Sequence, residues 1–270
     1  MSSSPHSASV ENLIQAYCKF SESETALKSP EVNRYVTDII TSPDQLILFL
    51  AKMPLIRQDP SRDDHYDLIQ HQRLPLLKLI IETARTRLSK EEFLNFLTRE
   101  HDFYGSPLSA ACFIGATTFA AYLLTQPEVC PLFSVSSTGV SAFGKVLYNA
   151  AHPDQYTNPK FNRALILKFL DHPDYYPVIE SMKASMDIDE LATAESMPGG
   201  FSAYLHSKVG TYAPIAGTDQ HIFEFNPEGL AWLSRALTDH TQRIRSRWSP
   251  LRSAWTAAVV RATPTSPVAP

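Results

Sequence analysis

The stretch "FYGSPLSAACFIGATTFAAYLL", residues 103–124, contains the pattern that decides the fold. The pair Ser106-Pro107 opens an Ala-rich apolar segment, and a single glycine, Gly115, separates this segment from a second one. A serine hydroxyl can accept a hydrogen bond from the free amides of a first helical turn, and proline loses no bond at the first helical position. Glycine commonly ends helices. The stretch therefore predicts two short helices, one on each side of Gly115.

Serine or asparagine precedes proline at five further places, and each pair stands before a helical pattern of apolar residues. These pairs are Ser29-Pro30, Ser42-Pro43, Asn158-Pro159, Asn226-Pro227 and Ser249-Pro250. Ser89 and Glu92 have the spacing of a capping box, which starts another helix. The combined pattern predicts an all-α fold with helices over residues 10–20, 30–40, 43–52, 74–88, 90–99, 107–114, 117–125, 141–151, 159–170, 174–185, 227–238 and 250–262.

One segment, residues 210–225, has a different character because its "HIFEF" run is rich in β-forming residues. We expect an irregular insertion or a hairpin there. The polar ends, residues 1–9 and 263–270, are expected to be disordered. Between them the pattern suggests an N-terminal helical cap over residues 10–73, a repeat region over residues 74–186, and a C-terminal helical region over residues 187–262.

A short helix pair cannot bury its apolar face alone, so such pairs stack on their neighbours. The run Ser106-Pro107-Leu108-Ser109-Ala110-Ala111, with Gly115 after it and Phe119-Ala120 and Leu123-Leu124 in the second helix, resembles an ankyrin repeat. Asp102 and Gly105 lie where the ankyrin β-turn finger would precede the helices. The convincing unit covers residues 105–124, and a weaker resemblance extends over residues 74–170.

The resemblance implies a degenerate ankyrin-like solenoid of short helix pairs with non-repeat helical caps. It also implies a protein-binding module that recognises a partner through its loop tips and concave helical face. Isolated ankyrin-like units with helical flanks are similar to those of bacterial effectors delivered into host cells, which implies a host protein as partner. A non-ankyrin α-solenoid, or a compact helical domain with one accidental match, explains the same residues.

Exposed aromatic side chains on a rigid loop often anchor a binding surface. On the expected finger, the candidate partner-binding residues are His101, Asp102, Phe103 and Tyr104. The alternative is that Phe103 or Tyr104 packs under the neighbouring unit. Further aromatic candidates in loops and at helix starts are Tyr156, Phe161, Tyr175 and Tyr176.

Two other functions compete with protein recognition. A helical enzyme could use His221 and Asp219 in the insertion as acid and base. The tripeptides His152-Pro153-Asp154 and His172-Pro173-Asp174 match the signature loop of J-domain cochaperones, although both also read as the end of one helix and the cap of the next. The sequence has no phosphate-binding glycine motif and no zinc spacing, so we expect no catalytic residue, cofactor or metal.

The composition restricts the class of binding partner and the cellular compartment that we expect. The net charge of −4 argues against nucleic acid, because phosphate binding needs a basic surface. The three cysteines are few and far apart, which favours a reducing compartment, and Cys112 is expected to be a small buried hydrophobe. The N-terminus lacks the features of a signal peptide and no apolar run is long enough to span a membrane, so we expect a cytoplasmic protein.

The C-terminal segment combines arginines with an apolar stripe at helical spacing, formed by Ile244, Trp248, Leu251, Trp255 and Val259. A basic amphipathic face can contact an anionic membrane. The favoured interpretation is a capping helix that buries both tryptophans, as the last unit of a solenoid must.

Overall fold

The computed structural model describes residues 5–19, 24–52, 63–102, 104–134, 140–151, 159–214 and 221–248. This part of the chain is mostly helical, which confirms the all-α prediction. None of its helices is both long and apolar enough to cross a membrane. The helices are α1 (Pro5–Lys19), α2 (Glu24–Leu27), α3 (Pro30–Ile40), α4 (Pro43–Lys52), α5 (Asp63–Arg87), α6 (Lys90–Thr98), α7 (Pro107–Phe113), α8 (Thr117–Leu123), α9 (Ala142–Ala151), α10 (Pro159–Leu170), α11 (Tyr176–Lys183), α12 (Ile188–Ser196), α13 (Gly200–Val209) and α14 (Pro227–Trp248).

Capping residues fix many of the helix starts at the predicted positions. The hydroxyl oxygen of Ser29 accepts a hydrogen bond from the amide of Glu31, and that of Ser106 accepts one from the amide of Ser109. The capping box is also present, because Ser89 bonds the Glu92 amide while the Glu92 carboxylate bonds the Ser89 amide. The hydrogen bonds from the Ser89 amide and hydroxyl stabilise the charged carboxylate, and they therefore lower the pKa of Glu92.

The expected helix start at Leu74-Pro75 is wrong. Pro75 lies inside α5, which begins at Asp63. Proline has no N–H, so it cannot donate the helical hydrogen bond to the main-chain oxygen of His71, four residues earlier. The buried Tyr17 hydroxyl donates to the main-chain oxygen of Gln72 at 3.0 Å, close to this position. The expected boundary between cap and repeats therefore falls within one continuous helix.

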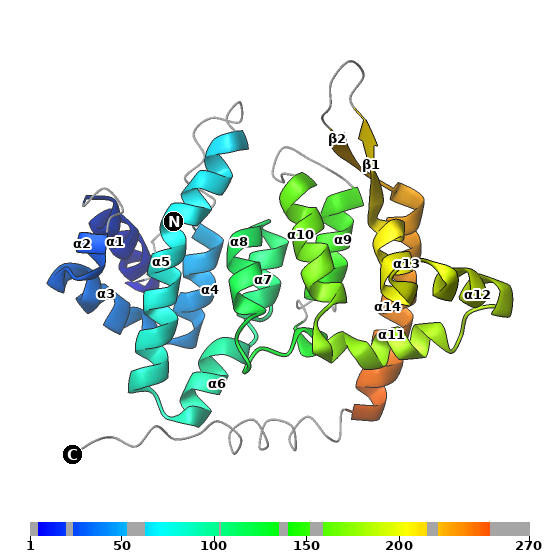
Figure 1. Cartoon of the computed structure of the whole chain (residues 1–270). Helices are drawn as coiled ribbons and strands as arrows, with labels where there is room; N and C mark the ends of the chain where they lie inside the picture. The colour runs from blue at the N-terminus through cyan, green and yellow to red at the C-terminus, as the bar shows by residue number, and fades with distance from the viewer. Residues whose placement is uncertain are drawn as a thin grey trace.

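The helices follow one another roughly in chain order from left to right in Figure 1. Two rows of contacts link them. In the first row α4 packs on α7, α7 on α9, and α9 on α14; in the second row α5 packs on α8, α8 on α10, and α10 on α13. One continuous apolar core runs between the rows, from Val10 in α1 to Ile244 in α14.

The expected hairpin is present as strands β1 (Gly210–Pro214) and β2 (His221–Phe225), which pair antiparallel with Gly210 opposite Phe225. Arg163 of α10 holds the hairpin, because its guanidinium carbon lies 5.1 Å from the ring centre of Tyr212 and 4.6 Å from that of Phe223. The hairpin projects beyond the ends of the neighbouring helices (Figure 1).

The C-terminal half differs from the prediction in three helices. The expected helix over residues 227–238 continues to Trp248, and neither α12 nor α13 is among the predicted helices. Ile244 is buried, in agreement with the capping interpretation. Leu251, Trp255 and Val259 lie outside the described residues.

Candidate partner-binding surface

A tight turn precedes α7, where the sequence predicted a finger. His101 and Gly105 exchange main-chain hydrogen bonds with N–O distances of 3.0 and 2.9 Å. Gly105 has a φ of 70°, in the left-handed region that favours glycine. The turn is therefore short and fixed at its base, and it begins directly before the Ser106 cap of α7.

The joint between α7 and α8 is equally well defined. Gly115 has a φ of 74°. Its amide donates to the main-chain oxygen of Cys112, and the amide of Ala116 donates to that of Ala111 at 2.8 Å. This pair of bonds is a Schellman motif, which satisfies the free carbonyl groups at the end of α7. The predicted helix–glycine–helix unit is confirmed as local structure.

Four side chains from the turn, α7 and α9 form what we call the aromatic–lysine surface. They are Tyr104, Phe113, Lys145 and Tyr148. The rings of Tyr104 and Phe113 meet edge to face at 6.1 Å. The Lys145 ammonium lies 4.7 Å from the ring centre of Phe113 and 4.8 Å from that of Tyr148. Phe113 is 39% exposed and Tyr148 56% exposed.

The surface is preorganised by its own contacts. Lys145 between two rings makes cation–π interactions that restrict all three side chains. The Asn149 amide of α9 donates to the main-chain oxygen of Cys112 at 3.3 Å, which links the two helices beneath the surface. Half-exposed aromatic rings around a cation can bury an apolar side chain of a partner and pair with a carboxylate.

The structure describes the predicted finger residues in part. Asp102 is exposed, whereas His101 and Tyr104 are half-buried and pack against each other with ring centres 5.7 Å apart. Phe103 lies outside the described residues. Tyr104 therefore joins the aromatic–lysine surface through Phe113 instead of projecting alone.

The secondary aromatic candidates have different outcomes. Tyr175 is wrong as a binding residue, because it is 1% exposed and packs against the ring of Phe143 at 5.2 Å. Its neighbour Tyr176 is 55% exposed. Tyr156 lies outside the described residues, and Phe161 lies in α10 with its side chain outside them.

Sequence reasoning missed Phe113, Lys145 and Tyr148. A signal existed in α9, because Lys145 and Tyr148 are three residues apart and therefore share a helix face. Phe113 lies in the apolar run of the predicted helix over residues 107–114, which gives no sign of its exposure. Only the packing of α9 on α7 brings these residues together, and that contact could not be inferred from either helix alone.

The two cysteines whose side chains are described, Cys112 and Cys130, offer no reactive group near this surface. Cys112 is 1% exposed, as expected for a small buried hydrophobe, and burial raises the pKa of its thiol. Burial also raises the pKa of the Cys130 thiol, with a further contribution from the nearby Asp174 carboxylate. A thiol whose pKa is raised stays protonated near neutral pH and is a poor nucleophile.

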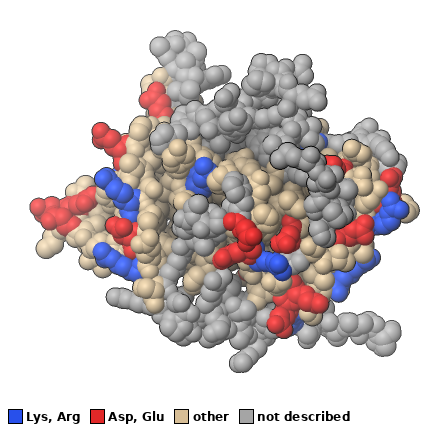
Figure 2. Space-filling model, turned by 180° about the vertical axis from the view of Figure 1, so that it is seen from behind, with Lys and Arg blue, Asp and Glu red and all other residues tan. Residues whose placement is uncertain are grey.

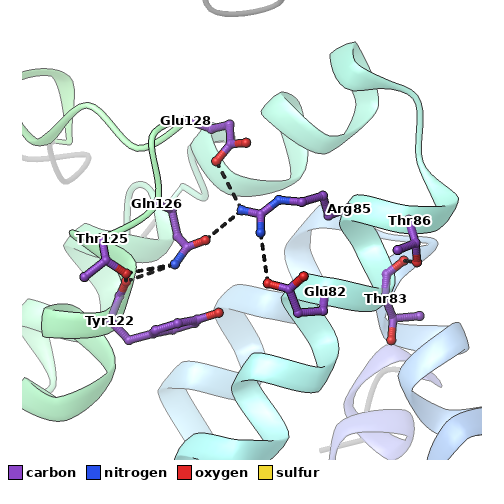
Figure 3. Close-up of polar contacts among 8 residues, drawn as sticks. All are labelled: Glu82, Thr83, Arg85, Thr86, Tyr122, Thr125, Gln126 and Glu128. Carbon is purple, nitrogen blue, oxygen red and sulfur yellow. Dashed lines mark hydrogen bonds and ion pairs between the residues drawn. The ribbon is translucent and has the colours of Figure 1, made fainter. Parts of the chain in front are cut away.

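Figure 3 shows a polar cluster that is structural. Arg85 of α5 bonds the Glu82 carboxylate at 2.9 Å, the Gln126 amide oxygen at 2.8 Å, and the buried Glu128 carboxylate at 3.5 Å. The charge of Glu128 is therefore paired. Because Gln126 and Glu128 follow α8, the cluster fixes that connection against α5.

The competing functional motifs gain no catalytic geometry among the described residues. His221 is exposed on β2, and Asp219 lies outside the described residues. His172 caps a short 3-10 helix (Pro173–Tyr175), since its Nδ1 accepts from the Asp174 amide; the predicted cap, Asp174, is replaced by His172 in that role. His152-Pro153-Asp154 lies outside the described residues, so the cochaperone hypothesis stays a prediction.

A serine–histidine contact lies between α11 and α14. The Oγ of Ser181 is 2.8 Å from Nδ1 of His240, and the Oγ of Ser185 is 3.2 Å from Nε2. A hydroxyl within hydrogen-bond distance of an imidazole is the geometry of a nucleophile and base. Here both ring nitrogens are occupied by serines, Ser181 of α11 and Ser185 just after its end, so neither nitrogen is oriented by a carboxylate. The contact joins two helices.

Charges on the face drawn in Figure 2 are mixed. Acidic side chains lie at both sides and in the lower centre of this face, with Lys and Arg side chains beside them. Recognition of a phosphate backbone needs a contiguous basic surface, and the described residues of this face do not form one.

In comparisons with protein-family models, curated proteins and solved structures, no significant match to this chain was found. The ankyrin resemblance, the effector role and the cytoplasmic location therefore stay predictions.

Proposed function

We propose that this chain is a protein-recognition module built as an ankyrin-like helical solenoid. Three features support the solenoid: the helix–glycine–helix unit of α7 and α8, the fixed turn before it, and the two rows of helix contacts. In a solenoid each helix pair contacts chiefly the pairs before and after it. The rows α4–α7–α9–α14 and α5–α8–α10–α13 have this order.

The observation that carries the recognition function is the aromatic–lysine surface. It combines the turn with the first-row helices α7 and α9, which is where ankyrin-like proteins place their binding surface. Aromatic residues are enriched among the side chains that dominate binding energy. Because Phe113 and Tyr148 are already held by Lys145, little side-chain ordering remains to oppose association.

The test compares two double variants in affinity purification from cells that produce the protein, followed by quantitative mass spectrometry. Phe113→Ala/Tyr148→Ala removes the two exposed rings of the surface. Ile188→Ala/Tyr212→Ala is the matched control, because it truncates two exposed apolar side chains on α12 and β1. Each loss of a central anchor costs about 2 kcal/mol or more, which is more than tenfold in affinity.

The expected result is a stoichiometric partner protein that is retained by the control and lost from the Phe113→Ala/Tyr148→Ala variant. Circular dichroism must show the same helical content for all proteins. A partner retained equally by both variants would exclude this surface, and the absence of any protein partner would contradict the recognition function.

A further inference from the structure

A groove on the second row of helices has no part in the aromatic–lysine surface. Helix α8 forms its floor, and α5 and α10 form its walls; these three helices lie side by side in Figure 1. Its volume is about 340 Å³. Small-molecule sites in proteins span about 300–1,000 Å³, so the groove has the size for a small ligand and is too small for a folded partner.

The groove exists because one face of α8 has small side chains. Thr117 and Ala121 are four residues apart and therefore lie on one face of α8, and Thr125 continues this line just beyond the end of the helix. Leucines stand on both walls, Leu74 on α5 and Leu165 on α10. Because the small residues of α8 lie between these larger leucines, they leave a groove with an apolar lining.

The lining contains two lysines and no aspartate or glutamate. Lys78 on α5 and Lys168 on α10 come from opposite walls, and His71 lies one turn before Leu74. The Lys78 ammonium lies 5.7 Å from the ring centre of Tyr122. Glu82 lies one turn beyond Lys78, but its carboxylate is already paired with Arg85 (Figure 3).

Buried polar groups at the start of α8 lack partners among the described residues. Gln70 of α5 accepts a hydrogen bond from the Thr118 amide at 3.0 Å, but its own amide nitrogen has no acceptor. The hydroxyl of Thr117, a residue that lines the groove and is 6% exposed, also has no partner. An unpaired buried polar group is costly, and a ligand that supplies the missing hydrogen-bond partner would remove that cost.

We propose that this groove binds a small amphipathic anion, a compound with an apolar body and a carboxylate. The carboxylate pairs with Lys78 and Lys168, and the apolar body covers Leu74, Ala121 and Leu165. The two lysines on the walls favour a ligand with a negative charge, and the apolar lining favours a ligand with a hydrocarbon or aromatic body. The proposal is independent of protein recognition, because the two sites use different rows of helices.

The test measures binding of decanoate to the full chain by displacement of 8-anilinonaphthalene-1-sulfonate, a fluorescent apolar anion. Decan-1-ol and decyltrimethylammonium serve as control probes, because each has a ten-carbon alkyl group like that of decanoate but no negative charge. Lys78→Glu/Lys168→Glu reverses the wall charges. Lys28→Glu/Arg235→Glu changes the net charge equally at two exposed positions that do not line the groove. Ala121→Phe fills the floor without changing charge.

The expected result is that decanoate displaces the fluorescent anion from the wild-type protein and that the two uncharged or cationic probes do not. Affinity should fall about tenfold or more in Lys78→Glu/Lys168→Glu and in Ala121→Phe, and should be kept in Lys28→Glu/Arg235→Glu. Three outcomes would overturn the proposal: equal binding of decan-1-ol, an unchanged affinity in both groove variants, or preference for a glutamate-rich peptide over decanoate.

Discussion

At the scale of single residues, His240 is the clearest titratable group inside the fold. It is 7% exposed and bonds both Ser181 and Ser185. Ser185 donates its proton to the main-chain oxygen of Met182 at 2.8 Å, so its oxygen accepts from Nε2–H. Nδ1 then accepts from Ser181. Both contacts are made by a neutral ring, so protonation would disturb the contact between α11 and α14.

This arrangement predicts a loss of stability in mild acid. Burial lowers the pKa of His240, the charge of Arg243 lowers it further, and Asp239 opposes them. In the unfolded chain the ring titrates near its ordinary pKa of about 6.5. Below that pH the unfolded state binds the proton first, so the free energy of unfolding decreases as pH falls. Urea unfolding between about pH 7.5 and about pH 5 measures this slope.

The control is His240→Gln, which cannot titrate but can still hydrogen-bond. It should cost about 1 kcal/mol at neutral pH and should have a shallower pH dependence than the wild type. The other histidines are unchanged in this variant, so the difference between the two slopes belongs to His240. Identical slopes would show that the pKa of His240 is the same in both states.

Adjacent residues illustrate what the sequence could predict at this scale. Tyr175 and Tyr176 have the same side chain and neighbouring positions, yet Tyr175 is buried against Phe143 and Phe169 while Tyr176 is exposed. The difference depends on the short 3-10 helix that sets the phase of α11. Local capping chemistry predicted where helices begin, but not which side of each helix meets the core.

At the scale of elements, proline shows the limit of local reasoning. Ser29-Pro30 and Ser106-Pro107 start helices because serine caps the first turn. Leu74-Pro75 offers no such cap, and the apolar residues on both sides of Pro75 pack into one core along a single helix. Tertiary packing therefore outweighs the local penalty of a proline inside a helix.

The hairpin gives a prediction for one element. A two-stranded hairpin is marginally stable in water without further packing. Arg163, between Tyr212 and Phe223, ties β1 and β2 to α10. We expect Arg163→Ala to speed hydrogen exchange of the paired amides in β1 and β2 by roughly fivefold to thirtyfold, the equivalent of about 1–2 kcal/mol of lost cation–π interaction. Hydrogen–deuterium exchange of peptides from the hairpin, followed by mass spectrometry, measures this change in rate.

Lys168→Ala on the same helix is the control, because it removes a cation that contacts neither ring of the hairpin in the described structure. Exchange in α13 and α14 should remain at the wild-type rate in both variants. If Arg163→Ala left the hairpin amides unchanged, the hairpin would be held by its own pairing and by the packing of Phe223 and Phe225.

At the scale of the whole molecule, the two rows of helices separate two surfaces. The aromatic–lysine surface uses α7 and α9 of the first row, and the groove uses α5, α8 and α10 of the second. Periodicity and capping predicted most of these helices, and the resemblance predicted that pairs would stack. Neither could predict the surfaces, because each requires side chains from helices that are distant in sequence.

A solenoid and a protein with a single compact core differ in how far from a destabilising substitution hydrogen-exchange protection is lost. Leu13 in α1 and Leu233 in α14 are both fully buried, and they lie near opposite ends of the stack (Figure 1). Replacing either leucine by alanine should cost about 2–5 kcal/mol. In a solenoid, where stability is a sum of neighbouring terms, Leu13→Ala should speed exchange in α1, α3 and α4 while α13 and α14 stay protected. Leu233→Ala should give the reverse pattern, with faster exchange in α13 and α14 and full protection of α1, α3 and α4. Hydrogen exchange of both variants is measured in parallel, and each variant is the control for the other. Equal loss of protection at both ends in either variant would indicate one cooperative core and would contradict the solenoid on which the proposed recognition function rests.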